Sequence, residues 1–163
     1  MKKRLIALAL LLSAGRCLAS SADHSCALVS CFPGDKGVTY ATKAEPFLAC
    51  PTRELADYTG FVLSLISLSI SLTGRLPNIS DKTGDPEYID GQDGPNKTRL
   101  MLDMLRSRAG VSTFDDAEQR CKNGIGNDHV LVMNVPENGY SIWVRDTKRN
   151  QSFWMPKSSL DKQ

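Results

Sequence analysis

The feature that most constrains this sequence is its long apolar segment, which runs from Cys50 to Gly74. Pro51 is tolerated in a first helical turn, and a glycine at position 74 followed by Pro77 is typical of a helix end. Apolar side chains recur at spacings of three and four, which is the period of one helical face, at Tyr58, Phe61, Leu65, Leu68 and Leu72. The segment therefore predicts one long helix that packs in a core or against a partner.

Two other interpretations of this segment stay open. No charged residue falls between Tyr58 and Leu72, so the segment is also a candidate membrane helix. It is shorter than the about 20 apolar residues that a bilayer requires, and serines interrupt it. From Leu68 to Leu72 apolar residues alternate with serine, which is the period of a strand.

Residues 1–19 have the parts of a secretory signal peptide. Lys2, Lys3 and Arg4 form a positive start, and an apolar stretch too short to span a membrane follows. We expect cleavage after Ala19 and an exported protein, located in the bacterial periplasm. A membrane-associated or secreted protein is the alternative. Residues 20–163 have the length of a single domain with its own core.

The charge balance excludes one class of partner. The whole chain has 20 basic and 18 acidic residues, and the first 19 residues hold four of the basic ones and no acid. The chain without them therefore has 16 basic and 18 acidic residues, and it lacks a basic stripe. This composition argues against nucleic-acid binding.

Four cysteines follow the expected signal peptide, at positions 26, 31, 50 and 121. An even number of cysteines in an exported chain indicates a disulfide framework. Three pairings are open, and we favour Cys26 with Cys31 and Cys50 with Cys121. The second pairing would tie the start of the central helix to a later helix.

Residues 75–96 predict a long acidic loop rich in glycine, proline and aspartate. Its acidic side chains, Asp85 and Asp90 among them, are candidates for contact with a partner. Their spacing does not match a calcium-binding EF-hand loop, and no histidine and cysteine pattern fits zinc. We therefore expect no metal and no cofactor.

The rest of the chain predicts an α+β fold: a helical N-terminal half and a C-terminal three-stranded antiparallel meander, stabilised by disulfides. Helices are expected over 97–108 and from Thr113, and the meander lies within 128–160, where the apolar period changes to two. Asn138-Gly139 is a strong hairpin signal between its first two strands. An earlier hairpin is expected to pair residues 27–29 with 38–40.

The end of the chain carries the run IWVRDTKRNQSFWMPKSSL. It resembles the closing part of a bacterial SH3-like module, which ends in a tryptophan strand, a turn, a Gly-Trp-Val-Pro strand and a short helical turn. The residues that match this pattern are Trp143, Val144, Trp154, Met155, Pro156 and Leu160. The resemblance covers about the last fifth of the chain and implies peptidoglycan as a partner. Ser152 and Phe153 stand where the module usually has glycine.

The chain lacks the sequence motifs of common enzymes, so we expect no catalytic residue and no enzymatic activity. We expect a non-catalytic binding or assembly protein of the periplasm or envelope, such as an accessory of a secretion or conjugation apparatus, which could itself form homo-oligomers. Alternatives are an inhibitor or immunity protein that blocks a toxic enzyme, and a small exported hydrolase that uses His129 with a cysteine. The candidate partner-binding aromatics are Tyr140, Trp143 and Trp154.

Overall fold

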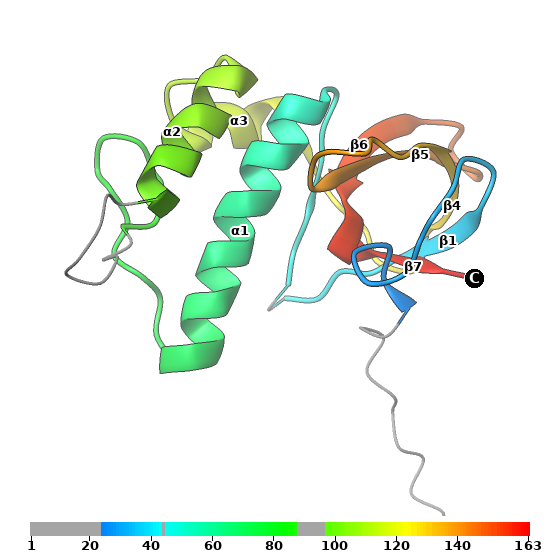
Figure 1. Cartoon of the computed structure of the whole chain (residues 1–163), viewed down its shortest axis with the longest axis horizontal. Helices are drawn as coiled ribbons and strands as arrows, with labels where there is room; N and C mark the ends of the chain where they lie inside the picture. The colour runs from blue at the N-terminus through cyan, green and yellow to red at the C-terminus, as the bar shows by residue number, and fades with distance from the viewer. Residues whose placement is uncertain (1–23, 44, 88–96) are drawn as a thin grey trace, which may run out of the picture.

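The computed structural model describes residues 24–43, 45–87 and 97–163 (Figure 1). The expected signal peptide and Asp90 lie outside these residues. In chain order the elements are β1 (Lys36–Thr39), β2 (Leu48–Ala49), α1 (Arg53–Thr73), α2 (Lys97–Ala109), α3 (Phe114–Arg120), β3 (Lys122–Asn123), β4 (His129–Asn134), β5 (Ser141–Asp146), β6 (Ser152–Pro156), the 3-10 helix η2 (Lys157–Ser159) and β7 (Leu160–Lys162). The described residues thus form a mixed α and β fold with an antiparallel sheet.

The central apolar segment is a helix, so the strand interpretation of Leu68 to Leu72 is wrong. The Thr52 side chain caps α1 by accepting a hydrogen bond from the Leu55 backbone N–H, and Pro51 precedes the cap. Gly74 ends α1 with a φ of 70°, and its N–H donates to the Ile70 carbonyl. Both ends of the helix are therefore set by local chemistry.

The other two helices also have readable ends. Gly110 follows α2 with a φ of 63°. At α3 the Thr113 hydroxyl accepts from the Asp116 N–H while the Asp116 carboxylate accepts from the Thr113 N–H, which is a capping box. These helices begin and end within a few residues of the predicted positions.

The sheet has five antiparallel strands in the order β6-β5-β4-β1-β7. The expected meander forms its β4, β5 and β6, whereas β1 comes from before the helices and β7 from the end of the chain. β1 lies between β4 and β7, with Val38 opposite both His129 and Asp161. The sheet therefore joins both ends of the described chain and curls beside the helices (Figure 1).

The expected hairpin between residues 27–29 and 38–40 is wrong. The Cys26–Cys31 disulfide holds the two Cα atoms 5.5 Å apart. Five residues of extended chain would span about 17 Å, so the segment between these cysteines turns instead of forming a strand. β1 is consequently free to pair with β4 and β7.

The second disulfide joins Cys50 to Cys121, which are 71 residues apart. Leu48 and Ala49 of β2 pair with Asn123 and Lys122 of β3 beside it. All three helices lie between these two cysteines, so they form one excursion that is closed at its base. Two disulfides are typical of proteins from an oxidising compartment.

The helices and the sheet have separate cores. The helical core centres on buried side chains of α1 and α2: Leu55, Tyr58, Val62, Leu102 and Leu105. The sheet core is built from buried side chains of β4, β5, β6 and β7: Val130, Val132, Ile142, Val144, Met155 and Leu160. α1 packs on β5 and β6 and joins the two units.

Candidate functional site

The C-terminal half of α1 leaves its apolar side chains uncovered. All of the buried residues of α1 lie between Leu55 and Leu65. Ile66 still packs on the helical core, but from Leu68 onward the large apolar side chains of α1 are exposed, and Leu72 and Leu76 each keep 72% of their surface accessible. We call this region the distal surface of α1 and define it by Leu68, Ile70, Leu72, Leu76 and Ile79.

The lengths of the helices explain why this surface is bare. α1 has 21 residues and is about 32 Å long, whereas α2 has 13 residues and is about 20 Å long. The end of α1 extends past α2 and past the sheet (Figure 1). α2 is therefore too short to cover the whole apolar length of its neighbour.

A groove continues from the distal surface toward the sheet. It has a volume of about 560 Å³ and lies between α1 and the segment around η2. Small residues of α1 line it, namely Gly60, Ser64, Ser67 and Ser71, together with Leu63 and Leu68. At the end of the groove nearest the sheet, α1 lies close to Pro156, because a Cβ added at Gly60 would be only 3.0 Å from the proline ring. The groove thus extends the exposed apolar region with a strip lined by hydroxyl groups.

α1 is also, among the described residues, the one helix long and apolar enough to cross a membrane by length and composition. In its most apolar window 39% of the residues are buried inside the protein. Its first half forms the core with α2 and the sheet, so the distal surface and the groove beside it are the parts of α1 available for other contacts.

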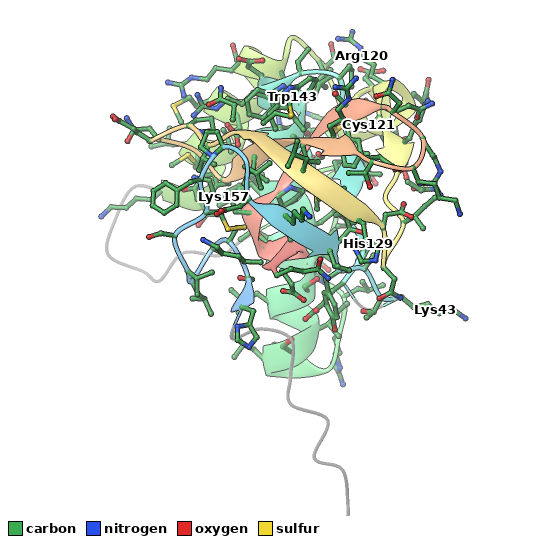
Figure 2. The ribbon with its side chains drawn as sticks, turned by 90° about the vertical axis from the view of Figure 1, so that its right-hand side faces the viewer. Lys43, Arg120, Cys121, His129, Trp143 and Lys157 are labelled. Atoms are coloured by element: carbon green, nitrogen blue, oxygen red, sulfur yellow. A yellow bond between two sulfur atoms is a disulfide. The ribbon has the colours of Figure 1, made fainter. Side chains whose placement is uncertain are left out.

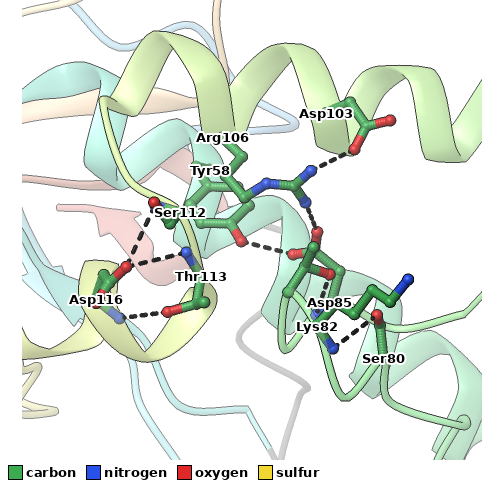
Figure 3. Close-up of polar contacts among 10 residues, drawn as sticks. Tyr58, Ser80, Lys82, Asp85, Asp103, Arg106, Ser112, Thr113 and Asp116 are labelled. Carbon is green, nitrogen blue, oxygen red and sulfur yellow. Dashed lines mark hydrogen bonds and ion pairs between the residues drawn. The ribbon is translucent and has the colours of Figure 1, made fainter.

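A polar latch fastens the loop before α2 to both α1 and α2 (Figure 3). The Tyr58 hydroxyl donates to the Asp85 carboxylate at 2.6 Å, and Arg106 forms ion pairs with Asp85 and Asp103. Asp85 is only 5% exposed. Burial raises the pKa of Tyr58 far above its usual range, and the Asp85 charge raises this pKa further.

The latch corrects one expectation, since Asp85 was a candidate for contact with a partner. Its burial and its two partners leave it unavailable for such a contact. The loop around it is compact: Ile79 bridges to Pro86, and the Glu87 N–H donates to the Asn78 carbonyl at 2.7 Å. The latch thus holds residues 78–87 in a defined shape.

The candidate aromatics divide into two kinds. Trp143 and Trp154 lie opposite each other on β5 and β6 with ring centroids 5.2 Å apart. Trp154 packs against the helical core, so it joins the sheet to the helices. This packing makes it a structural residue and not a free contact for a partner. Trp143 is half-buried, whereas Tyr140 is 52% exposed and stacks on Phe61 of α1.

The hydrolase hypothesis used His129 with a cysteine, and the cysteines of the described residues do not supply a free thiol for it. His129 is exposed at the start of β4, and its carbonyl accepts from the N–H and the hydroxyl of Thr147. Cys26, Cys31, Cys50 and Cys121 are all in disulfides, so none of them presents a thiolate to this imidazole.

Metal ligands do not gather in the described residues either, since no group of three or more histidine, cysteine, aspartate or glutamate side chains could hold an ion there. Beside the latch a cleft of about 530 Å³ has a mixed lining of both charges, with Lys82, Arg99 and Arg106 facing Asp81, Glu87 and Asp103. Neither the sign of its charge nor its shape favours one ligand class.

Sequence reasoning missed Arg106 and the groove beside η2. A signal for Arg106 was present, because it lies among the apolar positions Leu102, Leu105 and Ala109 of α2, where a charge needs a buried partner. The groove has no such signal, since its two walls are far apart in the chain. In comparisons with known proteins, no family model, no curated protein and no solved structure matches this chain.

Proposed function

We propose that this protein is a non-catalytic binding or assembly protein of the bacterial periplasm or envelope, and that it binds a partner protein through the distal surface of α1. The observation that carries this proposal is the group of exposed large apolar side chains between Leu68 and Ile79, at the end of α1 and in the loop after it. So many exposed large apolar side chains within one short segment favour an interaction site over scattered surface residues. The two disulfides support an oxidising location.

A protein partner fits this surface better than a lipid bilayer. The eight residues of α1 after Leu65 extend about 12 Å, which is less than half of the about 30 Å hydrocarbon layer. A helix that lies on a membrane surface usually has lysine and arginine on its polar face. The polar face of α1 carries serine instead, and Arg75 is the first charge beyond the helix.

Photo-crosslinking in cells tests the proposal. A photoreactive phenylalanine analogue replaces Leu72, and in a matched control it replaces Phe32, which is also exposed but lies on another surface, beside Lys162 of β7. We expect a discrete adduct from position 72 that the additional change Leu76→Asp removes. An adduct of twice the protein's own mass would identify a homo-oligomer as the partner. Equal crosslinking from the two positions would contradict the proposal.

An inhibitor or immunity protein is the second candidate. The observation that favours it is the latch, because a loop held in one shape loses little entropy on binding. Asp81 and Lys82 are exposed at the turn of this loop. The same crosslinking assay from position 81 separates the two candidates, since an adduct from position 81 and none from position 72 would favour the inhibitor.

We infer further that the five-stranded sheet is an SH3-like barrel. Support comes from its ending, in which β6 with Trp154, Met155 and Pro156 is followed by the helical turn η2 and by Leu160. Leu160 is fully buried in the sheet core. Co-sedimentation with purified peptidoglycan tests the partner that this resemblance implies, and the variant Leu72→Asp should not change it.

A further inference from the structure

Strand β6 has an open edge at its beginning. On its inner side it pairs with β5, and the Asp146 N–H donates to the Gln151 carbonyl at 2.8 Å. Bonding alternates along an antiparallel pair, so the N–H and C=O of Ser152 point away from β5. Trp154 has the same orientation, and it exchanges hydrogen bonds of 2.8 and 2.9 Å with Cys50 on the outer side.

A proline in β6 agrees with this assignment. Pro156 lies four residues after Ser152, so its nitrogen also faces away from β5. Strands tolerate proline where the N–H would point out of the ladder. The outer side of β6 is therefore an edge. Cys50 covers this edge at Trp154, but no strand among the described residues pairs with it at Ser152.

The edge is open because the neighbouring chain leaves the sheet there. Pro51 follows Cys50 and has no N–H, and Thr52 caps α1, so the chain turns into the helix. This departure leaves a slot of about 270 Å³ between the start of β6 and the chain from Arg120 to Ile125. The slot lies where β2 would continue if it kept pairing along β6.

One cation of the slot, Arg149, is already paired with both of the acidic residues there. Arg149 bonds to Asp128 at 2.5 Å and to Asp146 at 2.7 Å. Burial alone would raise the pKa of Asp146, but hydrogen bonds from the Arg149 and Lys148 N–H groups and from the Arg149 guanidinium hold this pKa below its usual range. These three residues therefore satisfy one another.

Two further cations line the slot, Arg120 at the end of α3 and Lys122 in β3. Within the described residues neither forms a salt bridge. Arg120 lies at the surface next to Cys121 (Figure 2). The other walls of the slot are apolar, with Ala49, Pro51, Ile125 and Phe153. The slot thus combines an open strand edge, apolar walls and excess positive charge.

We propose that this slot binds the carboxyl-terminal end of an extended polypeptide. The backbone of the bound segment pairs with Ser152 and takes the place of the missing continuation of β2. Its last side chain packs on Ile125 and Phe153, and its terminal carboxylate bonds to Arg120 and Lys122. Strand addition and carboxylate capture are both established ways for proteins to bind peptides. This site is separate from the distal surface of α1.

Fluorescence polarisation with a labelled peptide of alternating threonine and valine tests the proposal. We expect the form with a free carboxylate to bind about tenfold more tightly than its carboxamide twin. Arg120→Gln and Lys122→Gln should each weaken binding about fivefold, because each removes one charge-assisted hydrogen bond. Arg108→Gln on α2 is the matched control and should change nothing, since Arg108 does not line the slot.

The edge itself is tested by Ser152→Pro, which removes the outward N–H and leaves the ladder with β5 intact. We expect this variant to keep the near-ultraviolet circular dichroism of the wild type and to lose peptide binding. Equal binding of the two peptide forms overturns the proposal, as does the absence of any binding at millimolar peptide. Competition by inorganic phosphate combined with unchanged binding to Ser152→Pro also overturns it, because it identifies a simple anion site.

Discussion

At the scale of single residues, the role of a carboxylate depends on the side chains that surround it. Asp85 belongs to a polar, acidic stretch, yet it lies in the interior between the Tyr58 hydroxyl and the Arg106 guanidinium. It is one of the few charged groups that the core holds. A buried charge is stable there only because both partners bond to it.

Removing that carboxylate should therefore be costly. We expect Asp85→Ala to lower the free energy of unfolding by about 3 kcal/mol, because Arg106 and Tyr58 would lose their common partner inside the protein. The control is Asp103→Ala, which removes the half-exposed partner of Arg106 and should cost less than about 1 kcal/mol. Urea denaturation of both variants measures the difference. Equal losses would show that the latch is not buried in solution.

At the scale of elements, α1 has two halves with different surroundings. The first half, from Leu55 to Leu65, supplies buried residues to the helical core, and the second half has solvent on its apolar side. Packing therefore cannot hold the second half, so its stability depends on local interactions. Serine and threonine hydroxyls there bond to carbonyls of the preceding turn, as Ser71 does to Ser67.

The C-terminal end of α1 tests whether local interactions stabilise this half of the helix. We expect Gly74→Ala to cost about 1 kcal/mol, because a side chain at a φ of 70° is strained. Ser71→Ala, three residues earlier on the exposed helix, should stay within about 0.5 kcal/mol of the wild type. Thermal unfolding followed by circular dichroism compares the two. A neutral Gly74→Ala would mean that the left-handed end is absent in solution.

At the scale of the whole molecule, the fold is a sheet with a helical excursion inserted between two of its strands. β1 precedes the excursion, and β4 to β7 follow it. The excursion begins and ends where β2 pairs with β3, and the Cys50–Cys121 disulfide closes it. The two disulfides accordingly constrain the unfolded chain to very different extents.

This difference predicts unequal stabilisation. In the chain-entropy model, a loop of 71 residues gives about 4 kcal/mol and a loop of five gives about 2 kcal/mol. We expect the variant Cys50→Ala with Cys121→Ala to lose about twice the stability that Cys26→Ala with Cys31→Ala loses, as measured by urea denaturation. A larger loss from the second pair would contradict the view that the long loop dominates.

Much of this fold was predictable because it rests on short-range chemistry. Helix ends at Gly74 and Gly110 and the cap at Thr113 follow from backbone preferences of single residues. The strands β4 to β6 follow from a period of two, although the predicted two-residue turn at Asn138-Gly139 is in the structure a longer connection over 135–140. The disulfide pairing that the sequence analysis favours is the one in the structure.

Apart from the disulfide pairing, the tertiary structure decided what depends on residues far apart in the chain. β1 carries only four residues, and nothing within it shows that it pairs with β4 and β7. Asp85 is polar in sequence, and only the fold brings Tyr58 and Arg106 to it. The sequence by itself determined both ends of α1, the extent of α2 and the start of α3, since those choices lie within a few bonds. Burial and strand partners required the packed chain, because each depends on what distant segments place beside a residue.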